Sequence, residues 1–182
     1  METLVPQSRQ GEIEVIFLTG LYFQLGQIIL FREIMVLSHG TEQLWGAILA
    51  FWMLGAALGV RWNHRSPFDL APDAPYLTLW PLFVAGPTLA GLVVGLRLSA
   101  WYGSFQAGQM ISLGRGLITA ALGTMPLAWL SGRQFGLLIR WAGPRSLGRL
   151  YRAEAWGAMF GGLLTGLVLE CFGQVLPLAL GG

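Results

Sequence analysis

The stretch LYFQLGQIILFREIMVLSHGTEQLWG, residues 21–46, places polar side chains within a long apolar run. The run extends from about residue 16 to residue 37, which is long enough for a helix to cross a hydrocarbon layer of about 30 Å. Polar and charged groups are costly in such a helix and usually have a partner or a function there. The rest of the chain therefore decides whether this stretch crosses a membrane. Its polar residues include Gln24, Gln27, Arg32, Glu33 and Glu42.

The composition predicts an integral membrane protein. Of the 182 residues, 54% are hydrophobic and only 11% are charged, whereas a soluble domain has about 25% charged residues. The 26 glycines and 8 tryptophans point the same way, since both are favoured in or beside membrane helices. All 11 basic residues are arginines placed beside apolar runs, so we expect the lipid bilayer as a partner and no nucleic acid.

Five apolar runs predict an all-α, polytopic transmembrane bundle with about five spans in a single domain, residues 1–182. The first run is too long for a cleavable signal peptide and has no small-residue cleavage site. After the fourth run, Arg133, Arg140 and Trp141 suggest an amphipathic segment at the membrane interface. The predicted spans lie near 16–37, 44–60, 76–96, 110–130 and 155–180.

The arginines predict the orientation of the bundle. With five spans, the N-terminus and the second and fourth connections share one side of the membrane. This side carries eight arginines, and the opposite boundary has Arg32 and Arg97. The excess of arginine marks the cytoplasmic side, so we expect a cytoplasmic N-terminus.

Glycines four residues apart predict close helix contacts, because small residues on one face let two backbones approach. The densest set lies in the fifth run, and we expect that helix to be the packing centre of the bundle. The pairs are Gly55 and Gly59, Gly91 and Gly95, Gly157 and Gly161, and Gly162 and Gly166.

The polar residues of the opening stretch have alternative roles. Gln24 and Gln27 either hold helices together through their amides or line a polar cavity. Arg32 either reaches the headgroups or turns into the bundle beside the glutamines. Glu33 either pairs with an arginine or caps another helix. We expect Glu33 or Glu42 to meet an arginine near the same face, and Arg97 is the leading candidate because of its depth.

The remaining charges lie near the ends of the predicted helices. Glu42 and Glu154 come at helix beginnings, where the helix dipole favours negative charge. Arg115 and Glu170 are expected at similar depth and are candidate partners. No catalytic motif, metal site or cofactor site is present, and the single Cys171 excludes an internal disulfide.

Three segments together resemble the N-terminal transmembrane domain of bacterial membrane-bound spermidine synthase-like proteins. The first is the hairpin of residues 23–59, whose Arg-Glu and Gly-x-Glu placements are matched here. Where the family has asparagine between the glycine and the glutamate, this chain has Thr41. The second is ALGTMPL, residues 121–127, and the third is YRAEAWGAMFGGLLTGLVL, residues 151–169. The matching residues are Gln24 or Gln27, Arg32, Glu33, Gly40, Glu42, Ala50, Trp52, Met53, Leu54, Gly59, Gly123, Pro126, Leu127, Tyr151, Glu154, Gly157, Gly161 and Gly162.

The resemblance implies a non-catalytic membrane module associated with polyamine synthesis in the bacterial inner membrane. It would be an anchor or a conduit for a cytoplasmic aminopropyltransferase, a soluble half that these 182 residues lack. The apolar ending VLPLALGG is what we expect of a chain cut just after a span. A transporter-like bundle and a structural subunit of a larger membrane complex are the alternative functions.

Overall fold

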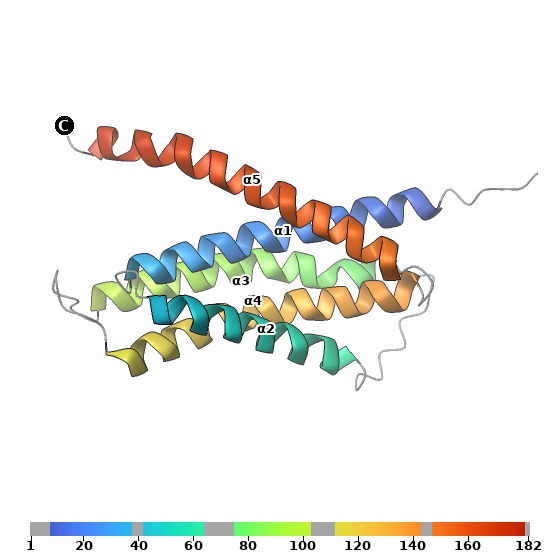
Figure 1. Cartoon of the computed structure of the whole chain (residues 1–182), viewed down its shortest axis with the longest axis horizontal. Helices are drawn as coiled ribbons and strands as arrows, with labels where there is room; N and C mark the ends of the chain where they lie inside the picture. Colours follow the sequence, from blue (N-terminus) through green and yellow to red (C-terminus); the bar gives the residue numbers. More distant parts are fainter. Residues whose placement is uncertain (1–7, 38–41, 64–74, 103–111, 143–146, 181–182) are drawn as a thin grey trace, which may run out of the picture.

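The computed structural model describes residues 8–37, 42–63, 75–102, 112–142 and 147–180, and side chains within 13–37, 42–62, 80–99, 112–140 and 147–168. These residues form five α-helices and no strand, so the all-α prediction is confirmed (Figure 1). The helices are α1 (Ser8–Leu37), α2 (Glu42–Asn63), α3 (Pro75–Tyr102), α4 (Leu113–Ala142) and α5 (Leu147–Leu180).

Three of the helices contain segments that are long and apolar enough to cross a membrane. These segments are Ile13–Leu37, Glu42–Trp62 and Trp80–Ser99. Within the described residues, α4 and α5 do not meet the same condition of length and apolarity. The chain therefore has the features of a membrane protein, with three candidate spans where the sequence predicted about five.

The helices extend beyond the predicted spans, most clearly in α4. The prediction ended that span at residue 130, but α4 continues to Ala142. Gln134, Leu137 and Leu138 are buried in this extension and Arg140 is exposed, so one face packs within the bundle and its position at the membrane interface stays a prediction. Arg133 and Arg140 interrupt the apolar run without interrupting the helix.

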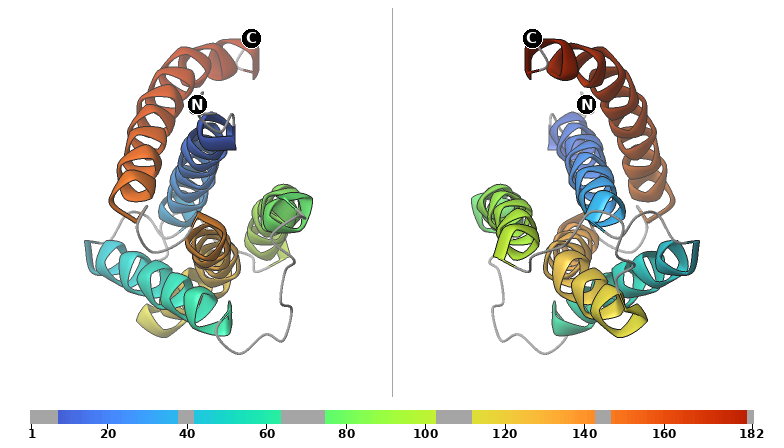
Figure 2. Two further views of the ribbon diagram at one scale, coloured as in Figure 1. Left: turned by 90° about the vertical axis from the view of Figure 1, so that its right-hand side faces the viewer. Right: turned by 90° about the vertical axis from the view of Figure 1, so that its left-hand side faces the viewer.

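Two helix pairs make the most extensive contacts, α1 with α5 and α2 with α4 (Figure 2). Helix α4 also packs against α1 and α3, and α3 packs against α1. The prediction that the fifth helix is the packing centre is therefore wrong, because α4 has that place. Helix α5 contacts α1 extensively and α4 only slightly, and many of its large apolar side chains are exposed. These are Leu147, Tyr151, Trp156, Met159, Phe160, Leu163, Leu164, Leu167 and Val168.

Small residues explain the two tight pairs. A Cβ atom added at Gly157 would meet the backbone of Phe17, and one added at Gly161 would lie 2.7 Å from the carbonyl oxygen of Leu21. In the other pair, a Cβ at Gly55 would lie 2.9 Å from the carbonyl oxygen of Met125, and one at Gly59 would meet the backbone of Trp129.

The other predicted glycines are not in tight contacts. A Cβ at Gly162 would meet only the Cδ1 atom of Ile28, at 4.0 Å, and one at Gly166 would meet nothing within 4 Å. Gly91 and Gly95 on α3 also face open space. Only some of the four-residue spacings therefore mark a helix interface.

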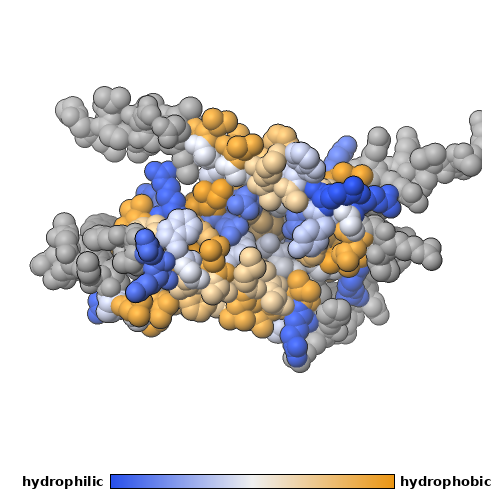
Figure 3. Space-filling view, in the orientation of Figure 1, coloured by the Kyte–Doolittle hydropathy of each residue, from blue (hydrophilic) through white to orange (hydrophobic). Residues whose placement is uncertain are grey.

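Two apolar clusters form the interior. The larger cluster contains residues from α1, α2, α3 and α4, among them Leu30, Ile34, Ile48 and Leu127. The smaller cluster contains Ile16, Leu138, Leu150 and Ala153. On the side of the molecule shown in Figure 3, apolar residues cover much of the described surface, and strongly hydrophilic residues lie mostly towards its two ends. A bilayer would cover such a surface, since soluble monomers rarely expose large apolar patches.

Candidate functional site

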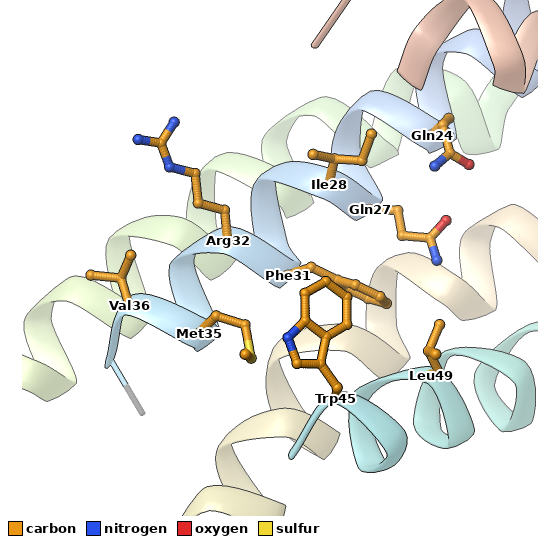
Figure 4. Close-up of a pocket in the computed structure, with 9 residues that line it drawn as sticks. All are labelled: Gln24, Gln27, Ile28, Phe31, Arg32, Met35, Val36, Trp45 and Leu49. Carbon is orange, nitrogen blue, oxygen red and sulfur yellow. The ribbon is translucent and has the colours of Figure 1, made fainter. Parts of the chain in front are cut away.

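A groove between α1 and α2 is the candidate site (Figure 4). It forms because α1 packs mainly on α5, and α2 mainly on α4, so that α1 and α2 make few contacts with each other. Its volume is about 770 Å³. This lies within the range of roughly 300–1,000 Å³ typical of pockets for small molecules. The lining residues are Gln24, Gln27, Ile28, Phe31, Arg32, Met35, Val36, Trp45 and Leu49.

Aromatic contacts form the wall where the two helices meet. The ring of buried Phe31 makes edge-to-face contacts with Trp45 and Trp52 of α2, with centroid separations of 5.9 and 6.2 Å. Such contacts hold apolar walls in a defined geometry. Ile28, Met35, Val36 and Leu49 add further apolar side chains, so the groove is largely apolar.

Three polar residues of the opening stretch line this groove. Gln24 and Gln27 follow one another along α1, and the guanidinium of Arg32 is directed away from both amides (Figure 4). At 1.5 Å per residue, Arg32 lies about 7.5 Å along the helix axis from Gln27. Among the residues that the structure describes, neither glutamine side chain makes a hydrogen bond. Arg32 is exposed, which agrees with the headgroup-directed alternative.

Glu33 has a different neighbour from Arg32, although the two are adjacent in sequence. Nε of Arg97 donates to Oε2 of Glu33 at 3.0 Å, and Nη2 donates to Oε1 at 2.7 Å. The side chain of Glu33 is 18% exposed and that of Arg97 is 69% exposed. The predicted partner of Glu33 is thus confirmed, and the fork geometry suits a carboxylate.

The other predicted polar residues lie elsewhere. Glu42 is exposed in the first turn of α2, and Arg115 is exposed near the beginning of α4. The side chain of Glu170 is outside those described, so its pairing with Arg115 stays a prediction. Glu154 lies on α5, outside the three candidate spans, and burial raises its pKa to about 7. The predicted set therefore does not converge on a single site.

A tryptophan cluster around Arg133 was not predicted. The guanidinium carbon of Arg133 lies 4.7 Å from the ring centroid of Trp80 and 5.3 Å from that of Trp129. Trp62 makes an edge-to-face contact with Trp129 at 6.2 Å. The four-residue spacing of Trp129 and Arg133 is the signal that could have identified part of it.

Gln134 is a second feature that sequence reasoning missed. Its side chain is fully buried, and neither amide atom has a hydrogen-bond partner among the described residues. Neighbouring turns of α4 carry Leu130 and Leu138, which belong to the two apolar clusters. The amide therefore lies on a face of α4 that is otherwise apolar.

The described part of the chain contains no group of three residues suited to bind a metal ion. Comparison with known protein families, curated proteins and solved structures finds no match to the chain.

Proposed function

We propose that the chain is a multi-pass module of the bacterial inner membrane that anchors a cytoplasmic aminopropyltransferase of polyamine synthesis, without catalysing the reaction itself. The resemblance described above motivates the enzyme partner. Three helices able to cross a membrane support the membrane location.

The charge of the groove favours an anchor over a conduit for polyamines. The charged residue that lines the groove is Arg32, which repels a polyamine cation. The adjacent acid, Glu33, is already paired with Arg97. A path for polyamines would instead need unpaired carboxylates that face the groove. The positive charge of Arg32 in the groove is the observation that favours the anchor over the conduit.

We also propose that α4 crosses the membrane. On α3, Trp80 and Arg97 are 17 residues apart, or about 26 Å at 1.5 Å per residue. Arg133 of α4 packs on Trp80. On α4, Arg115 and Arg133 are 18 residues apart, or about 27 Å. Arg115 and Arg133 on α4 are therefore separated by about the same length as Trp80 and Arg97 on α3, which belong to a candidate span.

The anchor role is tested by fractionation. A cytoplasmic aminopropyltransferase encoded by the same cells should sediment with the membranes when this chain is present, and remain soluble when its gene is deleted. Turnover by the purified chain alone, given putrescine and the aminopropyl donor, would show that the module is itself catalytic.

The transporter-like alternative is tested separately, by flux. Carriers often have helices interrupted at mid-membrane, whereas α3 is continuous through Pro81 and Pro87. Liposomes containing the chain should therefore retain labelled spermidine as well as protein-free liposomes do. Release that depends on the chain would favour a carrier over an anchor.

A further inference from the structure

We infer that the groove between α1 and α2 binds one anionic phospholipid, with the phosphate at Arg32 and an acyl chain along the apolar wall. The inference is independent of the aminopropyltransferase, because it rests only on the groove and its surroundings.

The charge at the rim of the groove selects an anion. Arg32 is exposed, and no acidic side chain among the described residues pairs with it. The neighbouring carboxylate of Glu33 is held by two hydrogen bonds from Arg97. A guanidinium binds phosphate through parallel N–H donors, so a lipid phosphate supplies the partner that the described residues do not.

The position of the groove makes a lipid the available ligand. Both walls belong to helices that can cross a membrane, Ile13–Leu37 and Glu42–Trp62. Arg32 lies towards the end of the first of these segments, where headgroups are within reach of a long side chain. Ile28, Phe31 and Leu49 continue the groove as an apolar surface, which suits a hydrocarbon chain.

One of the two glutamines, Gln27, lies at a depth that suits the polar part of the same lipid. Gln27 is about 7.5 Å nearer the middle of the span than Arg32. In a phospholipid, the ester carbonyls likewise follow the phosphate towards the membrane interior. An amide N–H of Gln27 can donate to such a carbonyl. This bond would offset part of the cost of an amide that has no hydrogen bond within the described residues.

A second copy of the chain is a less suitable occupant. A two-fold axis along the membrane normal would place both copies of each residue at the same depth. The two Arg32 side chains would then share one interface, where like charges repel. A protein partner in the groove is nevertheless a distinguishable result of the experiment below.

Quenching of tryptophan fluorescence tests the proposal, because Trp45 lines the groove. The full chain is placed in phosphatidylcholine nanodiscs that contain a small fraction of phosphatidylglycerol brominated on its acyl chains. Quenching should exceed that caused by the same fraction of brominated phosphatidylcholine, and Trp45→Phe should remove the excess. Arg32→Gln should raise the phosphatidylglycerol fraction needed for half-maximal quenching about tenfold, the loss expected for one hydrogen bond to a charged group.

Two further variants separate binding from folding and from general surface charge. Arg32→Lys keeps the positive charge and should keep most of the selectivity. Arg115→Gln removes an exposed arginine that does not line the groove and should leave the selectivity unchanged. Equal quenching by the two lipids in the unsubstituted chain overturns the proposal, as does unaltered selectivity in Arg32→Gln. Dimerisation that shields Trp45 from both lipids also overturns it, in favour of a second copy.

Discussion

Arg32 and Glu33 illustrate how two adjacent residues acquire separate roles on a helix. Successive side chains point about 100° apart, so the two charges cannot readily neutralise each other. Arg32 lines the groove and Glu33 pairs with Arg97 on α3. Sequence reasoning could predict the pair of Glu33 and Arg97, because each lies near the C-terminal end of its apolar run and a carboxylate there needs a cation.

Replacing the paired acid should cost more stability than replacing its neighbour. Glu33→Gln removes the salt bridge and leaves Arg97 without its carboxylate, whereas Arg32→Gln removes no ion pair within the described residues. The expected loss for Glu33→Gln in detergent is about 0.5–1 kcal/mol, since Arg97 is largely exposed. Thermal unfolding of both variants checks the order, and a larger loss for Arg32→Gln would place Arg32 in an internal polar site.

Gln134 is predicted to contribute no net stability through its amide. Leucine has a similar volume and does not require a hydrogen bond, so Gln134→Leu should leave the free energy of unfolding unchanged or raise it by about 1–3 kcal/mol. Chemical unfolding of the purified chain measures this difference, with Gln134→Ala as a control that opens a cavity. A clear loss in Gln134→Leu would mean that the amide has a polar partner.

The burial of Glu154 predicts a stability that falls as pH rises. The pKa of Glu154 is raised from 4.5 to about 7 in the folded chain, so the folded state holds its proton more tightly than the unfolded state. The contribution of Glu154 to the free energy of unfolding is fully present below about pH 4.5 and decreases until about pH 7. Melting temperatures across this range should show the decrease, and Glu154→Gln should reduce it. The same substitution at exposed Glu42 should leave the slope in place.

At the scale of the helix, the sequence identified small residues but could not assign them to a face. Gly161 and Gly162 are neighbours, yet only Gly161 approaches the backbone of α1. The consecutive pairs 157/161 and 162/166 have identical spacing, so spacing alone cannot choose between them. The central place of α4 was missed for a related reason. Its small residues are spread over several faces, with Gly123 against Ile34 of α1 and Gly132 against Ala56 of α2.

A matched pair of glycine substitutions tests the contact between α1 and α5. Gly157→Leu would drive a side chain into the backbone of Phe17, while Gly166→Leu on the same helix would extend into open space. The first should lower the free energy of unfolding by about 1–3 kcal/mol or more through overpacking, and the second should have little effect. Thermal unfolding in one detergent compares them, and equal stabilities would contradict the packing of α5.

For the whole molecule, apolar runs predicted where the five helices lie but not how they pack. Hydrophobicity alone does not decide packing in a membrane, because lipid tails are as apolar as leucine side chains. Contacts depend instead on small residues and polar pairs, which are few and degenerate in sequence. The groove between α1 and α2 was unpredictable for this reason. The sequence pointed to its polar lining residues Gln24, Gln27 and Arg32. The separation of α1 from α2, however, follows from the packing of α1 on α5 and of α2 on α4.

Whether α4 crosses the membrane, and in which direction the chain is inserted, can be decided together by labelling single cysteines. In a background with Cys171→Ser, cysteines are placed at Ser66, Ser104 and Ser146, in connections that lie outside the described residues. If the arginine-rich side is cytoplasmic, a membrane-impermeant thiol reagent applied to intact cells should label position 104 and spare position 66. Position 146 then shows whether α4 crosses the membrane. It is shielded if α4 crosses, and it is labelled like position 104 if only α1, α2 and α3 cross. Labelling of all three positions after cell lysis is the control, and the reverse pattern at 66 and 104 would overturn the orientation derived from the arginines.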